Sequence, residues 1–219
     1  MSAPEHDAFP TGFFDRDDDS PDARFYGPTR LVTHIDDEAV AAVGALYAEL
    51  GIDGAATGPR HVLDLMSSWV SHFRTPPTGL VALGMNAAEL DANTAATERV
   101  VQDLNQDPTL PFEDAMFDAV TCCVSVDYLV RPVEVLREAA RVLRPGGVLA
   151  VTFSDRCFPS KAVHGWLATD DAGRCGIVVA YLRHAGGYEE ADVSLRTPPT
   201  SGGDPLYAVV TRRAGAGRS

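Results

Sequence analysis

The sequence is poor in positive charge and in long apolar runs. Its 219 residues carry 18 Lys and Arg against 31 Asp and Glu, which gives a formal net charge of −13. A surface this negative repels phosphate backbones and anionic lipid, so we expect no nucleic-acid partner and no binding to a membrane surface. No apolar run approaches the roughly 20 residues that a membrane-spanning helix needs.

The sequence also shows no cysteine pattern for disulfides or metal binding, and no secretory signal is expected. Four cysteines without Cys-x-x-Cys spacing do not form a disulfide framework, and no two histidines have the spacing of metal ligands, so we expect no metal. The first ten residues have neither a basic start nor an apolar stretch, so no signal peptide is expected. These absences predict a cytoplasmic protein, as a monomer or a homodimer.

What remains is enough for a hydrophobic core. Hydrophobic residues make up 45% of the sequence and charged residues 22%, which is ordinary globular usage. At roughly 150 residues per domain, the length favours one domain with additions. We expect an acidic arm over residues 1–24 that is flexible or loosely docked. A single domain is expected over 25–213, whose residues 25–52 form a lid and a helix, and a frayed tail over 214–219. Aromatic residues in the arm are candidate anchors: Phe9, Phe13 and Phe14.

Strand and helix patterns alternate through the domain. A helix is expected to begin at Asp36 or Asp37 and to stop at Gly51. Strands are expected over 61–65, 80–84, 99–103, 117–124, 147–153, 192–196 and 206–211, and further helices over 133–143, 160–169 and 173–185. Strands separated by helices predict a mostly parallel sheet with helices on both faces, and the last two strands are expected to pair antiparallel. In such a sheet a ligand lies beyond the carboxyl ends of the strands, where the strand order reverses.

A series of short motifs then appears in a recognisable order. They are Val62–Met66 (VLDLM), Gly84–Asn86 (GMN), Gln102–Leu104 (QDL), Leu110–Phe112 (LPF), Phe117–Val120 (FDAV) and Val135–Gly147 (VLREAARVLRPGG). Their order and spacing resemble the class I S-adenosylmethionine-dependent methyltransferases, in particular the small-molecule, type 11-like branch. The resemblance implies an α/β, Rossmann-like, doubly wound sheet of seven strands in the order 3-2-1-4-5-7-6, with the last strand antiparallel. It also implies S-adenosyl-L-methionine as the cofactor.

Two positions depart from that family's pattern. The loop after the first strand normally carries several glycines, but residues 64–72 (DLMSSWVSH) contain none. Glycine is the residue that positive φ angles and close backbone approach usually require, so this loop must take another path. An acid normally follows the second strand to accept the ribose hydroxyls, and here Asn86 stands in its place.

The resemblance assigns residues to the cofactor and leaves several open between two roles. The expected cofactor-binding residues are Asp64, Met66, Ser67, Ser68, Trp69, Asn86, Asp103, Cys122, Cys123 and Val124, the last three through their backbone. Asp64 has one of two functional roles, meeting the cofactor or organising its loop, or else is a structural turn acid. Trp69 is either a lid or a hydrophobic plug. Asp103 lies beside the adenine or caps a turn. The two cysteine side chains are expected to pack in the core.

The acceptor side is expected between the lid and the ends of the fourth and fifth strands. Candidate catalytic residues are His34, His72 and Tyr128, and candidate substrate-binding residues are Tyr26, Arg30, Asp127 and Arg156. The histidines are potential general bases at neutral pH. His34 instead packs against a helix N-terminus in the alternative interpretation, and Arg156 instead pairs with a surface acid. The net charge predicts a neutral or cationic acceptor unless Arg30 or Arg156 lines the pocket.

The predicted function is methyl transfer from S-adenosylmethionine to a small-molecule acceptor. The alternative is a catalytically inactive methyltransferase-like protein that binds a ligand or partner, because the glycine-free loop and Asn86 depart from the family. A nicotinamide dehydrogenase on a similar sheet fits poorly, since no Gly-x-Gly-x-x-Gly follows the first strand.

Overall fold

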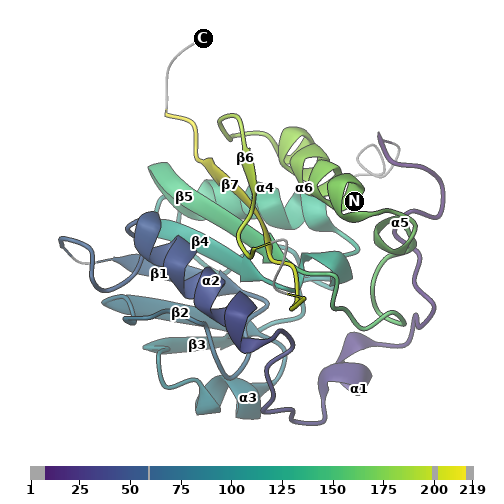
Figure 1. The fold of residues 1–219 in the computed structure, drawn as a ribbon, viewed down its shortest axis with the longest axis horizontal. Coiled ribbons are helices and arrows are strands. Elements are labelled where there is room, and N and C mark those ends of the chain that lie inside the picture. The colour runs from purple at the N-terminus through teal and green to yellow at the C-terminus, as the bar shows by residue number, and fades with distance from the viewer. Residues whose placement is uncertain (1–7, 59, 199–201, 216–219) are drawn as a thin grey trace.

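The computed structural model describes residues 8–58, 60–198 and 202–215, and its strands form one seven-stranded sheet (Figure 1). The strands are β1 (His61–Leu65), β2 (Gly79–Gly84), β3 (Glu98–Val101), β4 (Phe117–Cys123), β5 (Leu143–Phe153), β6 (Asp192–Leu195) and β7 (Tyr207–Arg212). Their order is β3-β2-β1-β4-β5-β7-β6. Strands β1 to β5 pair in parallel, and β7 is antiparallel to both β5 and β6. The expected fold and strand order are confirmed.

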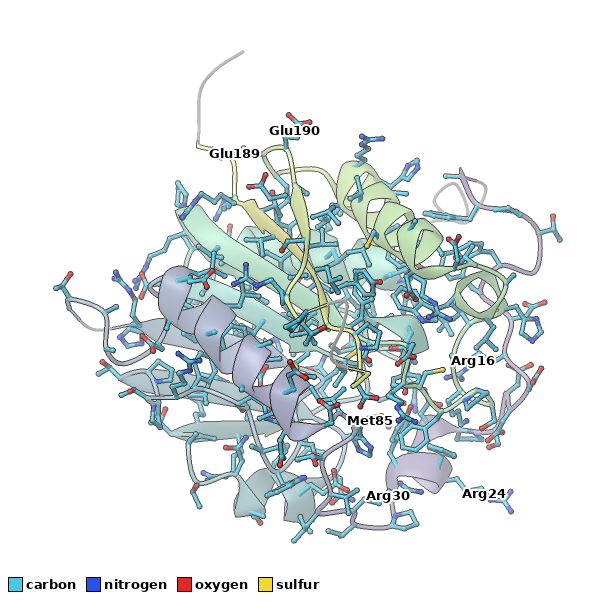
Figure 2. The ribbon with its side chains drawn as sticks, viewed as in Figure 1. Arg16, Arg24, Arg30, Met85, Glu189 and Glu190 are labelled. Carbon is cyan, nitrogen blue, oxygen red and sulfur yellow. The ribbon has the colours of Figure 1, made fainter. Side chains whose placement is uncertain are left out.

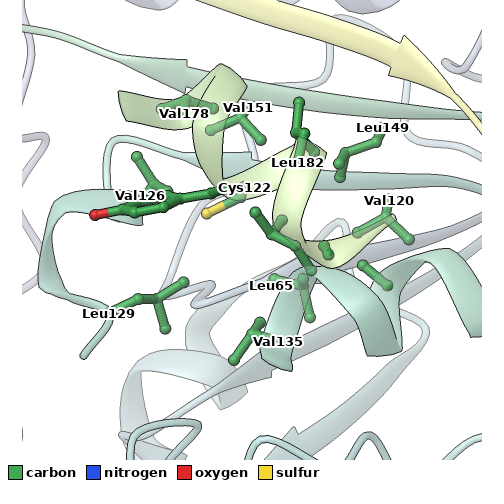
Figure 3. Packing of buried hydrophobic residues seen from close by; sticks show 14 of the residues in the cluster. Leu65, Val120, Cys122, Val126, Leu129, Val135, Leu149, Val151, Val178 and Leu182 are labelled. Atoms are coloured by element: carbon green, nitrogen blue, oxygen red, sulfur yellow. The ribbon is translucent and has the colours of Figure 1, made fainter. Parts of the chain in front are cut away.

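Helices cover both faces of the sheet. They are α1 (Asp22–Tyr26), α2 (Asp37–Glu49), α3 (Ala87–Ala92), the 3-10 helix η2 (Val126–Tyr128), α4 (Pro132–Val142), α5 (His164–Leu167) and α6 (Asp171–Ala185). Apolar residues of α2 pack on one face, and those of α4 and α6 pack on the other. Figure 3 shows the second of these layers, where Val178 of α6 lies beside Val151 of β5 and Leu182 of α6 lies beside Leu149 of β5. In the described part of the chain, no helix has the length and apolar character needed to cross a membrane.

The elements differ from the sequence expectation mainly at their ends. Asp36 caps α2 by accepting from the Ala39 amide, as expected. The helix predicted to include Leu143 stops one residue earlier, because Leu143 already pairs with Phe117 as part of β5. Helices α1 and α3 were not expected, and both are short.

Residues 8–24 of the acidic arm pack against the sheet domain, through the three aromatic residues singled out as candidate anchors. The rings of Phe9, Phe13 and Phe14 lie 5.4, 6.5 and 6.1 Å from the ring of Tyr181 on α6. The His164 amide donates to the Asp15 carbonyl, so backbone contacts add to the aromatic ones. Residues 1–7 of the predicted arm and 216–219 of the predicted tail lie outside the described residues.

A buried ammonium group is paired with two carboxylates of the arm. Lys161 is the only lysine of the sequence, and its side chain is 0% exposed. Its Nζ lies 3.1 Å from a carboxylate oxygen of Asp22 and 3.2 Å from one of Asp18, and it donates to the carbonyls of Asp18 and Ser20. Asp22 also accepts from Arg16, which is labelled in Figure 2. A buried lysine is stable only when its charge is compensated, so the acidic residues of the arm supply what Lys161 needs.

Candidate functional site

A pocket opens at the carboxyl ends of the parallel strands, where the sheet order changes direction. One side, called here the strand-end wall, is formed by pocket-lining residues within 64–72, 83–89, 102–105 and 123–129. The facing side, the N-terminal wall, is formed by lining residues within 22–34. Phe158 completes the lining from the loop that follows β5. The pocket therefore lies where this class of sheet places its ligands.

Most of the residues singled out in the sequence meet in this pocket. Those that line it are Tyr26, Arg30, His34, Asp64, Met66, Ser67, Ser68, Trp69, His72, Asn86, Asp103, Cys123, Val124 and Tyr128. Three lie elsewhere. The Cys122 thiol points into the core, 3.4 Å from the Ser125 hydroxyl, and Figure 3 shows it among Val126 and Val151. Arg156 donates to Asp204 at 2.7 Å and faces away from the pocket lining.

Asp127 is the third residue outside the lining. Its side chain is buried behind η2, and its Oδ2 atom has no hydrogen-bond partner among the described residues. Burial raises its pKa to about 7. Asp127, expected on the substrate side, is thus a buried carboxyl group of η2 that does not line the pocket.

Asp64 organises the loop that follows β1. It accepts from the Ser67 hydroxyl and from the Thr121 hydroxyl of β4, both at 2.7 Å. Burial raises the pKa of this carboxyl group, and the hydroxyl donors oppose that shift. Asn93 adds a second support by donating to Ser71 and to the Ser68 carbonyl. Of the two roles left open for Asp64, the loop-organising one is seen directly.

The glycine-free loop keeps positive φ angles without glycine. Met66 and His72 have φ of 53° and 55°, and Val124, after β4, has φ of 45°. This region costs a non-glycine residue roughly 1 kcal/mol or more, so the loop is held there by its contacts. The close backbone approach has moved to β2, because a Cβ on Gly84 would lie 2.1 Å from the Ser67 carbonyl oxygen.

Three side chains of the strand-end wall tie down the N-terminal wall. Asn86 donates from Nδ2 to the carbonyls of Tyr26 and Gly27, and its Oδ1 caps α3. Glu89 accepts from the Arg30 amide at 2.7 Å and from the Ser68 hydroxyl at 2.6 Å. The indole of Trp69 donates to the Val32 carbonyl at 3.0 Å. Asn86 and Trp69 thus act as tethers between the walls.

Two imidazoles face the pocket. Partial burial and the nearby Arg30 charge lower the pKa of His34, against an opposing effect of Glu89. Burial and the neighbouring His34 lower the pKa of His72. Both imidazoles are therefore neutral at pH 7, which is the form a general base needs. The His34 ring also packs edge-on against Phe158 at 5.2 Å.

Tyr128 and Cys123 are less suited to proton transfer. The Tyr128 hydroxyl accepts from the Phe158 amide at 2.9 Å, and burial raises the pKa of this phenol further above its ordinary value. This geometry gives Tyr128 a role in holding the loop after β5 rather than that of a base. Burial raises the pKa of Cys123 to about 12, so its thiol stays protonated. Asp103 caps the turn after β3 by accepting from the amides of Asn105 and Gln106.

Sequence reasoning missed Glu89, Asp22 and Phe158. The sequence did carry a signal for Glu89. An Asn followed three residues later by a Glu is typical of a helix N-terminus, so Asn86 and Glu89 would also have predicted α3. Asp22 and Phe158 are brought to the pocket by the docked arm and the loop after β5, and nothing in the local sequence marks them. In the described part of the chain, no group of three or more His, Cys, Asp or Glu side chains is arranged to hold a metal ion.

Comparisons with known proteins agree with this architecture. Residues 77–151 match the family described as "Methyltransferase domain". A 54-residue segment is 44% identical to the 27-O-demethylrifamycin SV methyltransferase of Amycolatopsis mediterranei, and it covers 25% of this chain and 20% of that protein. The match thus spans about a fifth of that relative's length.

Solved structures resemble the fold at low sequence identity. The [4+2]-cyclase SpnF has a TM-score of 0.56 at 16% identity, over 79% of this chain and 81% of its own. A sarcosine dimethylglycine methyltransferase of Galdieria sulphuraria, so described provisionally, has a TM-score of 0.56 at 14% identity, over 88% and 96%. The trans-methyltransferase CalH, solved with S-adenosylhomocysteine, has a TM-score of 0.56 at 16% identity, over 76% and 55%. Residues 77–151 thus match a methyltransferase domain, and the sheet as a whole has the fold of these solved structures.

Proposed function

We propose that this protein transfers a methyl group from S-adenosylmethionine to a small-molecule acceptor. The observation that carries the proposal is the pocket itself, at the carboxyl ends of β1, β2 and β4, with two neutral imidazoles on its surface. When bound, the cofactor supplies a methyl carbon on a sulfonium, whose C–S bond breaks as the bond to the acceptor forms and leaves a neutral thioether. The protein then has to align the two reactants and take up the acceptor's proton.

The residues of the strand-end wall fit the cofactor in most respects. The left-handed backbone at Met66 and the glycine at 84 give the loop after β1 the close approach that the family obtains from loop glycines. Met85, Leu104 and Val124 supply apolar surface to the same pocket. We propose that the loop carrying Met66 holds the amino-acid end of the cofactor and that these apolar residues hold its base.

The acceptor would lie toward the N-terminal wall. His34 and His72 are the candidates for taking its proton, since both line the pocket in the neutral form. The aromatic rings of Tyr26 and Phe158 lie on the same side. The pocket is closed over by a segment of the same chain, and this favours a small acceptor over a macromolecular one.

One observation favours the inactive alternative. Both polar ends of the Asn86 amide are already used, Nδ2 by the N-terminal wall and Oδ1 by α3, so it is not free to bind ribose hydroxyls. A methyltransferase-like protein that binds a ligand or partner without turnover is therefore the second candidate.

Calorimetric titration with S-adenosylmethionine and S-adenosylhomocysteine tests the proposal. We expect both to bind, and Asp64→Ala to weaken both by more than 10-fold, because the loop after β1 loses its buried acceptor. Ser67→Ala removes one of the same hydrogen bonds and serves if Asp64→Ala does not fold. The matched control is Asp118→Ala, at the opposite end of β4, where the carboxylate accepts from the His61 amide. No binding by the wild-type chain would contradict the proposal.

The decrease of activity at acidic pH tests whether His34 or His72 is the general base. Because the pKa of each histidine is lowered from 6.5, we expect kcat/KM on a responsive acceptor to stay constant from pH 8 down to about 6.5 and to fall below it, as the imidazole becomes protonated. His34→Gln and His72→Gln, measured separately, identify the base as the one whose replacement lowers kcat and removes this decrease. Equal profiles in both variants and the wild type would exclude both histidines.

A further inference from the structure

The carboxylates that line the pocket are already satisfied by the protein. Asp22 accepts from Arg16 at 2.8 Å and lies 3.1 Å from the Lys161 ammonium. Asp64 accepts from two hydroxyl groups, and Glu89 accepts from the Ser68 hydroxyl and the Arg30 amide. Asp22 is thus paired with two cations, and the oxygens of Asp64 and Glu89 are occupied by donors from the protein.

The Arg30 guanidinium group is in the opposite situation. It lies 5.0 Å from the ring centre of Phe25 and 6.0 Å from that of Phe158, and it makes one long hydrogen bond of 3.4 Å to the Pro28 carbonyl. Among the described residues, no carboxylate lies within ion-pair distance of it. Stacking on aromatic rings holds an arginine in place while leaving its planar fork of N–H donors available.

The other arginine candidate has no such freedom. Arg156 is paired with Asp204 at 2.7 Å, outside the pocket lining. Arg30 lines the pocket on the same side as Tyr26, His34 and Phe158. The net charge predicts a neutral or cationic acceptor unless Arg30 or Arg156 lines the pocket. Of these two arginines, only Arg30 does so.

We propose that Arg30 binds a carboxylate or another oxyanion on the acceptor, so that the enzyme selects acidic ligands despite its net negative charge. The guanidinium matches two oxygens at once, and the aromatic residues around it favour a ring next to the acidic group. This inference rests on the proposed function, because an acceptor exists only if the protein is a transferase. The cofactor's own carboxylate is the other source of the same chemistry, and the test separates the two.

Binding of matched aromatic probes tests this directly. On protein saturated with S-adenosylhomocysteine, calorimetry compares 4-hydroxybenzoate with 4-hydroxybenzamide, and 6-hydroxy-2-naphthoate with its amide. We expect each acid to bind more tightly than its amide, and Arg30→Gln to weaken the acids about 10- to 100-fold while leaving the amides unchanged. Arg24→Gln and Arg156→Gln are the controls, and neither residue lines the pocket. Figure 2 labels Arg24, which lies in α1, and Arg30, which follows that helix in the sequence.

A second pair of probes locates the anion. S-adenosylhomocysteine carries the amino-acid carboxylate, and 5′-methylthioadenosine lacks that end. If Arg30→Gln weakens S-adenosylhomocysteine but not 5′-methylthioadenosine, and leaves the aromatic acids unchanged, Arg30 binds the cofactor and the acceptor assignment is overturned. It is also overturned if no acid binds more tightly than its amide. If the wild type does not bind S-adenosylhomocysteine but still binds the aromatic acids through Arg30, the proposed function is contradicted. The assignment of Arg30 as an anion-binding residue would then still hold.

Discussion

The two walls of the pocket are built in different ways. The strand-end wall continues directly from β1, β2 and β4, whose parallel ladder and buried residues fix where each loop begins. The N-terminal wall has no strand, and its position depends on tethers from Asn86, Glu89 and Trp69 and on the buried charge of Lys161. One wall is positioned by the fold as a whole, whereas the other depends on a few polar contacts. Substitutions should therefore separate the two walls.

The largest effect is expected from Lys161→Met. Removing one partner of a buried charge cluster costs about 3–5 kcal/mol, and here the cost should fall on the arm and the N-terminal wall, which Asp18 and Asp22 belong to. Hydrogen exchange should show loss of protection in residues 8–26 while β1 and β4 stay protected. Arg183→Met, on the last turn of α6, is the control. Equal loss of protection in the sheet would show that the walls are not independent.

Gly84→Ala should disturb the strand-end wall instead. Its Cβ would lie 2.1 Å from the Ser67 carbonyl oxygen, so the loop must move, at a cost of about 3 kcal/mol. Gly176→Ala, in α6 with no atom within 4 Å of the added Cβ, should be stabilising by up to about 1 kcal/mol. Denaturant unfolding measures both. A Gly84→Ala variant as stable as the wild type would mean that the loop is not held against β2.

Asp127→Asn tests the buried carboxyl group of η2, which lies outside the pocket lining. Its pKa is about 7 when folded and near 3.8 when unfolded, so the folded state binds the proton more tightly. Wild-type stability from this group is therefore present below pH 4 and lost as the pH rises to 7. We therefore expect the stability of Asp127→Asn relative to the wild type to increase as the pH rises from 4 to 8, because only the wild type loses this contribution. A difference in unfolding free energy that does not change with pH would contradict the raised pKa.

The smallest effect is expected at Met66. Glycine removes the penalty of φ near 53°, whereas alanine keeps it, and both remove the same packing. Met66→Gly should therefore be more stable than Met66→Ala by about 1 kcal/mol in thermal unfolding. If alanine is equally stable, the loop relaxes out of the left-handed conformation without cost.

The same contrast explains what the sequence could and could not predict. The sheet was predictable because apolar runs such as residues 61–65 and 117–124 mark buried parallel strands, and the ends of these strands position Asp64 and Val124. The path of the glycine-free loop was not predictable, because Met66 adopts its conformation through contacts with other strands. The aromatic residues of the arm indicated where it could be anchored, but its charge pairing was not predictable, since Asp22 is paired with Lys161, far away in the sequence.

The isolation of Lys161 has a practical chemical consequence. As the sequence has no other lysine, the docked chain offers no accessible lysine amine to acylating reagents such as activated esters. Acylation of Lys161 requires the arm to leave its place, so the rate of labelling at this position reports how often the arm detaches. Mass spectrometry of a single peptide would then follow the opening of the N-terminal wall, with and without ligand, in the unmodified protein.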